Sequence, residues 1–408
     1  MPLYIKKCRN CNSKSIVNLF SLGKIRFTGK FPKYKEKIPY GELNLVMCKS
    51  CKLVQLKHIF NMSYLYNKDY GYRTGINLTM SNHVKNVVRK ISKVAKLKSG
   101  DNVLDIASND GTLLKNYNSK IKTWGIDPIL SKFNKEYKKI NYKISNFFNY
   151  KLILKKNKKT KFKIISALSV FYDLENPNTF LDGIKKLLHE KGIFYLEFQD
   201  LMMIIKYNMF DTICHEHLEY YSVTFINKLL KKHNLRIFDH SYNDINGGSS
   251  AYLICHSNAK YKTNRNKINK ILLNEKKFGI EKVSTYKNFK KRIDLMKKNL
   301  NLKIKKIIKS KKTIHGYAAS TKGNVLLQYY NLDNKKIKFI SDRNPKKTNL
   351  YTPGSNIRII TETESRKLKP DYYLVLAWHF KKEILLREKM IRKMGTKFIF
   401  PLPNIEII

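Results

Sequence analysis

The stretch VLDIASNDG, residues 103–111, predicts the fold of this 408-residue chain. A short apolar strand ends there at an acidic residue, and a turn containing Gly111 leads into a helix. In such a turn the backbone comes close to a ligand, and the acidic residue reaches it directly or through water. Turns of this kind usually carry glycine where this chain has Ala107 and Asn109. The stretch alone therefore also fits an ordinary strand-to-helix turn.

Further strands follow at intervals, with helical stretches between them. We expect them at 102–106, 123–126, 163–170, 192–198, 236–240 and 250–255. Strands that alternate with helices favour a parallel sheet with right-handed crossovers. The last two are joined by the tight turn Asn246-Gly247-Gly248, which makes them a hairpin at one end of the sheet. This is the layout of class I, Rossmann-like methyltransferases.

A second acidic residue strengthens the prediction of a nucleotide site. Asp127 ends the strand after the glycine turn, where a carboxylate binds the two hydroxyls of a ribose. Downstream, Asn146-Phe147-Phe148 carries aromatic rings that fit either an adenine cover or the core. The predicted cofactor is S-adenosylmethionine. Its predicted site comprises Asp105, Ala107, Ser108, Asn109, Gly111, Asp127, Phe147, Phe148 and Ser169.

Two C-x-x-C pairs lie near the N-terminus, Cys8/Cys11 and Cys48/Cys51. Each pair can present two thiolates to one tetrahedral ion, and four thiolates leave no open position. We therefore predict a structural zinc ion held by these cysteines, in a small module that the metal helps to fold.

The densest polar cluster is residues 211–222, DTICHEHLEYYS. It follows the fourth strand and its helix, on the side of an open α/β sheet where substrates bind. The cluster contains His215, Glu216 and His217. A general base or substrate-binding role is the favoured interpretation. A metal pair and satisfied structural polar groups remain the alternatives.

The pattern changes along the chain and divides it into four regions. Residues 1–75 form the zinc module, and 76–260 form the methyltransferase domain. In region 261–312 apolar residues recur every three or four positions, which predicts a long amphipathic helix. Residues 313–408 form a second α/β unit, with strands expected at 313–317, 338–340 and 372–377.

The composition is strongly basic, with a formal net charge of +52. Such a charge favours anionic partners, such as nucleic acid, membrane surfaces or phosphorylated small molecules. Heavy use of Lys, Asn, Ile and Tyr throughout also fits an AT-rich coding sequence, so the charge alone assigns no partner. We find no signal peptide and no apolar run long enough to span a membrane. We expect a cytoplasmic location.

The motifs together resemble the sugar C-methyltransferases of branched deoxysugar biosynthesis. The resemblance covers essentially the whole chain. It rests on the four cysteines, residues 104–114, Phe171–Pro177, His215-Glu216-His217, residues 246–249, Lys322-Gly323-Asn324 and residues 342–345. Antibiotic-pathway members of this family tend to carry Tyr where this chain has Cys214.

The resemblance implies three units: a zinc module, a methyltransferase core and a C-terminal Rossmann-like domain. It implies a nucleotide-diphosphate 4-keto sugar held between the last two. Catalytic roles would fall on the histidines and glutamate of the cluster and on a tyrosine after the zinc module. These candidates are His217, Glu216, His215, Tyr72 and Tyr70.

The predicted reaction is proton abstraction next to a ketone, followed by methyl transfer to the enolate carbon. Imidazole suits the first step because its pKa lies near neutrality. We expect a monomer that binds no membrane and no nucleic acid. Two alternatives stay open: a nucleic-acid (RNA) methyltransferase, and a non-catalytic scaffold that binds nucleotide sugars.

Overall fold

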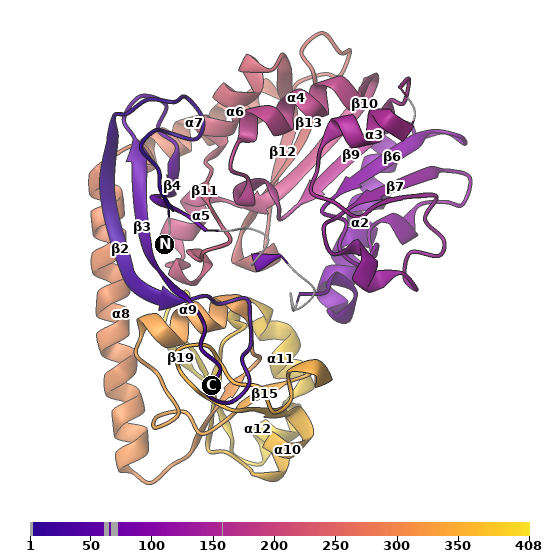
Figure 1. Cartoon of the computed structure of the whole chain (residues 1–408). Coiled ribbons are helices and arrows are strands. Elements are labelled where there is room, and N and C mark those ends of the chain that lie inside the picture. The colour runs from indigo at the N-terminus through magenta and orange to yellow at the C-terminus, as the bar shows by residue number, and fades with distance from the viewer. Residues whose placement is uncertain (1–2, 61–64, 67–71, 157) are drawn as a thin grey trace.

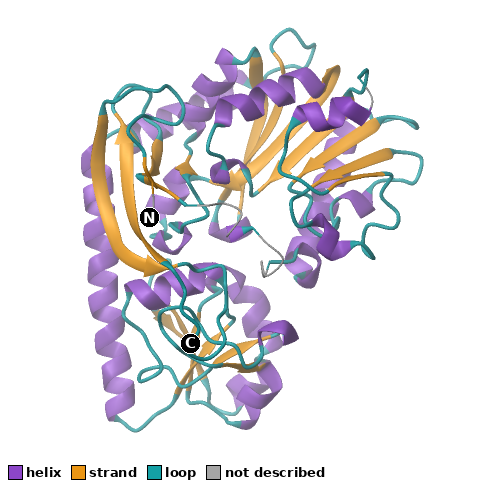
Figure 2. Ribbon diagram, in the orientation of Figure 1, coloured by secondary structure: helices purple, strands orange, loops and turns teal. Residues whose placement is uncertain are grey.

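The computed structural model of the chain describes residues 3–60, 65–66, 72–156 and 158–408 (Figure 1). Within these ranges the strands form four sheets, two of them in or near the N-terminal module (Figure 2). Of the candidate site residues, Tyr70 lies outside the described residues.

The central sheet has the strand order β12-β13-β10-β9-β6-β7-β8 within the described chain. Its strands are β6 (Asn102–Ile106), β7 (Lys122–Ile126), β8 (Tyr142–Ile144), β9 (Phe162–Leu168), β10 (Leu188–Gln199), β12 (Leu235–Asn243) and β13 (Ser249–His256). Strand β13 runs antiparallel to both neighbours, whereas β6 to β10 pair in parallel. This confirms the predicted parallel sheet with a terminal hairpin, the class I methyltransferase fold.

Helices cover both faces of this sheet, as Figure 1 shows. They are α2 (Leu78–Ala95), α3 (Tyr150–Lys156), α4 (Pro177–Leu187), α6 (Val223–Lys232) and α7 (Arg265–Phe278), whereas the short α5 (Leu201–Lys206) packs into the hydrophobic core shared with the N-terminal module. Helix α4 begins where it does because the Asn176 side chain accepts hydrogen bonds from the next free amides and Pro177 needs no amide partner. Its apolar face, including Phe180 and Leu187, is buried against the sheet.

The N-terminal module is built on an antiparallel sheet of order β11-β4-β3-β2. Its strands are β2 (Ile16–Arg26), β3 (Tyr40–Cys48), β4 (Val54–Leu56) and β11 (Glu219–Tyr220), with β1 (Leu3–Tyr4) paired to β5 (His58–Ile59) beside it. Strand β11 comes from the predicted polar cluster, more than 160 residues after β4. The sheet therefore ties the zinc module to the methyltransferase core.

The predicted amphipathic helix is α8 (Val283–Lys309), which runs along one side of the molecule (Figure 1). It buries Tyr286, Phe289, Ile293, Leu300, Ile304 and Ile307, as the spacing predicts, with Met296 partly buried. The Phe289 ring contacts Phe20 of β2 at a centroid distance of 5.6 Å. Helix α8 thus packs against the zinc module as well as the C-terminal unit.

The C-terminal unit is a sheet of order β16-β15-β14-β17-β18-β19. Its strands are β14 (Ile314–Tyr317), β15 (Ile340–Asp342), β16 (Ile359–Thr361), β17 (Tyr372–Val375), β18 (Lys397–Phe400) and β19 (Glu406–Ile407), and its helices are α9 (Thr321–Tyr329), α10 (Glu362–Lys367), α11 (Lys381–Arg387) and α12 (Lys389–Lys393). The first five strands pair in parallel in the Rossmann order. Strand β15 is placed two residues later than the predicted 338–340, although the backbone of Lys338 and Phe339 already forms hydrogen bonds with β14.

One hydrophobic core connects all four regions. It contains Leu43 of the module, Phe210 of the methyltransferase region, Ile293 of α8 and Tyr330 of the C-terminal unit. The rings of Phe210 and Tyr330 lie 4.9 Å apart. The residues around position 210 are therefore held between the core domain and the C-terminal unit. Among the described helices, none has the length and apolarity to cross a membrane.

Candidate active site

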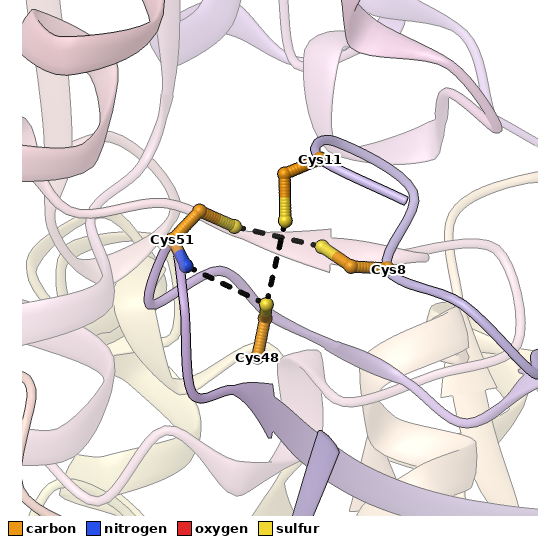
Figure 3. A group of neighbouring side chains, drawn as sticks. All are labelled: Cys8, Cys11, Cys48 and Cys51. Carbon is orange, nitrogen blue, oxygen red and sulfur yellow. Dashed lines mark hydrogen bonds between the residues drawn. The ribbon is translucent and has the colours of Figure 1, made fainter. Parts of the chain in front are cut away.

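The four predicted metal ligands come together at the end of the module. The Sγ atoms of Cys8, Cys11, Cys48 and Cys51 all lie within 4.8 Å of one another (Figure 3). The closest pairs are Cys8–Cys51 at 3.5 Å and Cys11–Cys48 at 3.6 Å. A zinc tetrahedron with sulfur ligands has edges of about 3.8 Å. The four side chains therefore fit a closed structural zinc site.

Buried polar groups support this cluster. Gln55 donates to the Cys8 sulfur at 3.4 Å, and a hydrogen bond from Cys51 is the main cause that lowers the pKa of Cys8 to about 4. The Arg9 guanidinium donates to the carbonyls of Leu56 and His58 at 2.6 and 3.0 Å. A thiolate-rich site is anionic, so a buried cation beside it offsets charge as well as fixing the turn.

The metal cluster is linked to the predicted polar cluster through backbone pairing. Gln55 and Val54 of β4, a few residues after Cys51, pair with Glu219 and Tyr220 of β11. Leu56 N also donates to the Leu218 carbonyl at 2.8 Å. The module therefore fixes the chain directly after His217.

The glycine-poor turn after β6 has the backbone that glycine usually provides. Ala107 has φ +57° and Asn109 has φ +48°, both in the left-handed region. Asparagine adopts this conformation readily, whereas alanine does so at a cost. The turn therefore keeps the shape of a ligand-binding loop although the glycines are absent, and Gly111 follows at φ +71°.

Asp127 holds this turn in place. Its two carboxylate oxygens accept hydrogen bonds from Asn109 N at 2.9 Å and Ile129 N at 2.8 Å. Each oxygen retains a second lone pair for another donor. Asp105 instead faces β9, where it accepts from the Ser166 hydroxyl at 2.6 Å, and burial raises its pKa to about 7. Ser108 is also buried and accepts a 2.7 Å hydrogen bond from Tyr137.

The segment after the zinc module lies over this turn. Thr74 N donates to the Asn109 side chain at 3.0 Å, and Gly75 N donates to Asp110 at 2.9 Å. Arg73 bridges Asp110 and Glu136 with contacts of 3.1 and 2.7 Å. These bonds bring the backbone of Tyr72 next to the predicted cofactor turn.

The remaining predicted cofactor residues divide between surface and core. Phe147 is 45% exposed, whereas Phe148 packs against Phe180 at 4.8 Å. Phe147 is therefore available to a ligand, and Phe148 belongs to the packing of α4. Ser169 directly follows β9 with φ +55°, and its hydroxyl accepts a 3.4 Å hydrogen bond from the Asn246 side chain.

His217 has a defined tautomer. Its Nδ1 lies 2.7 Å from the Thr212 carbonyl oxygen, which can only accept, so Nδ1 carries the proton. Nε2 is then an unprotonated acceptor with no hydrogen-bond partner among the described side chains. The ring lies 4.1 Å from that of Tyr172. Burial, and secondarily the charge of Lys322, lower the pKa of His217 to about 3.

Glu216 is a buried carboxyl group that lacks a hydrogen-bond partner among the described residues. It is 3% exposed, and within the described chain neither oxygen has a hydrogen-bond partner. Burial raises its pKa, and the Cys214 thiol and Thr28 hydroxyl lie close to it. A Cβ added at Gly29 would lie 2.6 Å from Glu216 Oε1, so the backbone of the zinc module touches the carboxylate.

The two histidines of the cluster point to different places. His215 lies between the rings of Phe27 and Phe60, at 4.6 and 4.7 Å, inside the zinc module. Its Nε2 contacts the Gly41 carbonyl at 3.3 Å, and burial lowers its pKa to about 3. The described residues bring no third metal ligand to the pair. Tyr72, by contrast, lies within electrostatic range of Tyr172 beside His217 and is 47% exposed.

The C-terminal unit contributes groups that the sequence did not place in the site. Trp378 Nε1 donates to Asp211 at 2.8 Å, and Lys322 Nζ lies 3.3 Å from the Asn246 carbonyl. A Cβ at Gly247 would lie 2.6 Å from the Trp378 ring, so glycine is required at this contact. Lys322 carried a signal, because it belongs to the Lys-Gly-Asn motif, whereas nothing in the sequence around Trp378 marks it.

Comparison with known proteins identifies each region. Residues 8–66 match a family described as "Putative zinc binding domain", residues 70–240 a "Methyltransferase domain", and residues 244–403 a "C-methyltransferase C-terminal domain". A curated relative, C-methyltransferase NovU of Streptomyces niveus, is 27% identical over 410 aligned residues, covering 99% of this chain and 97% of the relative.

Solved structures of other methyltransferases each cover less than half of the chain. An S-adenosylmethionine-dependent methyltransferase from Clostridium acetobutylicum is 15% identical, with coverage of 43% of this chain and 92% of its own, at a TM-score of 0.35. Magnesium protoporphyrin IX methyltransferase from Synechocystis, solved with bound SAH, is 15% identical, with coverage of 46% and 91% and a TM-score of 0.34. The three family matches, taken in order, span nearly the whole chain. The chain is thus an S-adenosylmethionine-dependent C-methyltransferase whose three regions match, in order, a zinc-binding domain, a methyltransferase domain and a C-methyltransferase C-terminal domain.

Proposed function

We propose that the enzyme methylates a carbon next to the ketone of a nucleotide-diphosphate keto-sugar in deoxysugar biosynthesis. The observation that carries this proposal is the state of His217. Its Nδ1 proton is held by the Thr212 carbonyl, which leaves Nε2 free to act as a base within electrostatic range of Lys322 of the C-terminal unit. Carbon methylation next to a ketone needs such a base, because the carbon is a nucleophile only after it loses a proton.

The proposed steps follow from that base. His217 Nε2 takes the proton from the carbon beside the ketone; the C–H electrons form a C=C bond, and the carbonyl becomes an enolate oxygen. S-adenosylmethionine supplies the methyl group, and attack by the enolate carbon restores the ketone. The proton leaves His217 for solvent. The low pKa of the free imidazole keeps it neutral, and a bound anion nearby favours the protonated form that follows.

Glu216 and Tyr72 complete the acceptor site in this proposal. Glu216 precedes the base in the sequence and has no hydrogen-bond partner in the part of the chain that the structure describes, so it orients the sugar through a hydroxyl or shares the proton. Burial raises the pKa of the Tyr72 hydroxyl, which lies within electrostatic range of Tyr172, and Tyr72 is proposed to present this hydroxyl to the substrate. Tyr70 is proposed as an alternative to Tyr72. His215 serves the site indirectly, by packing the loop that carries Glu216 against the module.

For the cofactor, we propose that the turn 107–111 and Asp127 bind the adenosyl group. The left-handed backbone at Ala107 and Asn109 opens the turn, and Asp127 has lone pairs left for the two ribose hydroxyls. Phe147 covers the adenine, and Ser169 lies where the methionine part reaches the acceptor site. Asp105 and Ser108 support the turn from beneath.

Asp127→Ala is expected to weaken S-adenosylmethionine binding by roughly 30-fold, about 2 kcal/mol, because two ribose hydroxyls lose their acceptors. Isothermal titration calorimetry measures this. Asp342→Ala is a matched control: Asp342 ends the second strand of the C-terminal sheet and makes the same two backbone bonds, to Ala319 N at 2.7 Å and Asn344 N at 2.8 Å. It should leave cofactor affinity unchanged. Wild-type affinity in Asp127→Ala contradicts the assignment.

Glu216→Gln is expected to lower methyl transfer by about 10²-fold while stabilising the protein at neutral pH. The folded state raises the pKa of Glu216, so the proton-bound form contributes stability that is lost as pH rises through that pKa. The variant's advantage should therefore be absent at about pH 4 and present at about pH 8. Thermal unfolding at the two pH values and a methylation assay measure both effects.

Glu275→Gln provides the contrast for that variant. Glu275 is equally buried, but both of its oxygens accept amide hydrogen bonds of 2.7 Å, from Val223 and Thr224. It should lose stability and keep methylation in the folded fraction. If Glu216→Gln loses stability at neutral pH in the same way, Glu216 is a structural group.

The proposed function is tested directly with a panel of nucleotide-diphosphate keto-sugars and S-adenosylmethionine. Mass spectrometry should find a product 14 mass units heavier (CH₂), with the methyl group on carbon next to the ketone. Methylation of RNA instead, or cofactor binding with no transfer to any keto-sugar, would support one of the two alternative functions and contradict this one.

A further inference from the structure

Lys322 belongs to the C-terminal unit, and its side chain reaches the edge of the methyltransferase site. It stands in the first turn of α9, which Ser320 caps by accepting a hydrogen bond from Gly323 N. Its Nζ lies 3.3 Å from the Asn246 carbonyl, which also accepts from Gln199 Nε2 at 2.8 Å. The ammonium is therefore placed by the turn of the β12–β13 hairpin at the edge of the methyltransferase site.

The buried ammonium of Lys322 has few hydrogen-bond acceptors among the described residues. Its three protons have one acceptor, the Asn246 carbonyl, and no carboxylate of the described residues lies within ion-pair distance. Asp211 is the acidic group in electrostatic range, but one of its oxygens is engaged by Trp378 and the other has no partner within the described chain. Burial lowers the pKa of Lys322. A desolvated charge that lacks a partner in the free protein has donors left for a ligand.

The surroundings of Lys322 indicate which ligand atom it faces. Its charge acts on His217, the proposed base, and also on His379 and Cys214. When His217 takes a proton, two positive charges face each other in a buried site. An anion that forms between them at the same moment removes that repulsion.

On these grounds, and resting on the proposed function, we propose that Lys322 is a catalytic residue that contacts the ketone oxygen of the acceptor and stabilises the enolate. Proton removal at the adjacent carbon creates the negative charge on that oxygen, and no electron or proton passes to Lys322. The C-terminal unit thereby supplies the cation that stabilises the enolate oxygen, and the methyltransferase core supplies the base, His217.

The test measures exchange of the carbon-bound proton with heavy water at saturating keto-sugar, with the demethylated cofactor bound. Lys322→Met should lower this exchange rate by about 10²–10³-fold, the usual effect of removing one donor to an oxyanion. The KM for the sugar and the affinity for the cofactor should stay close to wild type. Lys322→Arg should recover part of the rate because it keeps the charge.

Lys336→Met is the matched control. Lys336 is also half-buried in the C-terminal unit, but its ammonium donates to the Asn331 carbonyl at 2.6 Å and to Asn301 at 3.2 Å, away from the site. It should exchange at the wild-type rate. If Lys322→Met does not fold, as judged by circular dichroism and cofactor binding, Lys322→Gln replaces it, since glutamine keeps a donor for Asn246 without the charge.

The outcomes separate this inference from the proposed function. Exchange in the wild type with an unchanged rate in Lys322→Met overturns the role of Lys322 alone. A loss confined to the KM for the sugar also overturns it, because that result describes a lysine that binds the diphosphate. Absence of exchange in the wild-type enzyme overturns the proposed function and this inference with it.

Discussion

His217→Asn is expected to lower methyl transfer by about 10²–10⁴-fold, the usual contribution of a general base. Asparagine can keep a hydrogen bond to the Thr212 carbonyl but offers no basic nitrogen where Nε2 stands. Cofactor affinity should not change, because none of the described contacts of His217 involves the turn 107–111. The measurement is single-turnover methylation of a keto-sugar, with calorimetry for the cofactor.

His240→Asn is the control for loss of a buried imidazole. His240 lies in β12, and its Nε2 contacts the Ser250 hydroxyl at 2.9 Å, remote from the acceptor. Some stability should be lost, and turnover per folded molecule should stay within a few-fold of wild type. If His217→Asn behaves in the same way, His217 does not act as the base, and the proton must go elsewhere.

Cys48→Ser is expected to remove the metal and to unfold the N-terminal module. A closed four-cysteine site binds one zinc ion per chain, and its binding free energy is part of the folding free energy. Because β4 pairs with β11 inside the polar cluster, just after His217, activity should fall together with the module. Elemental analysis of the freshly purified protein should give about one zinc per chain for the wild type and about none for the variant.

Cys255→Ser is the matched control, since Cys255 is a free, fully buried thiol in β13 outside the cluster. It should keep its zinc even if it loses stability. Metal-free wild-type protein, prepared without chelator, would contradict the zinc assignment. Zinc retained at full occupancy in Cys48→Ser would show that the four thiolates do not form one site.

Local patterns were enough to predict most of the fold. The alternation of apolar strands and helices predicted a parallel sheet that ends in a hairpin, although not its strand order or the short strand β8, and the C-x-x-C spacing predicted four sulfurs within reach of one ion. The apolar spacing predicted the buried face of α8. The role of the turn at 107–111 was ambiguous. Its shape depends on positive φ values, and alanine or asparagine at a position does not by itself predict a positive φ.

Long-range pairing was what the sequence did not reveal. Glu219 and Tyr220 form a two-residue strand in the sheet of the zinc module, too short to carry a periodic signal. That pairing turns His215 toward Phe27 and Phe60 of the zinc module, while His217 stays beside Tyr172 in the site. The two histidines of the His-x-His motif therefore lie in different environments.

The part played by the C-terminal unit is a second case. Lys322 and Trp378 reach the site only because the hydrophobic core joins α9 to the turn around Phe210. The same shared core crosses the predicted domain boundaries at 75, 260 and 312, which remain predictions. Contacts between regions, in contrast to patterns within them, depend on side chains hundreds of residues apart.

The central claim is that the enzyme makes a carbon nucleophile by removing a proton next to a ketone. Incubation of wild-type enzyme with a nucleotide-diphosphate keto-sugar and the demethylated cofactor in heavy water tests it most directly. The account predicts that deuterium enters the carbon that is otherwise methylated, and that His217→Asn stops this entry. Efficient methylation of the same sugar on oxygen, with no deuterium entering any carbon, would contradict it.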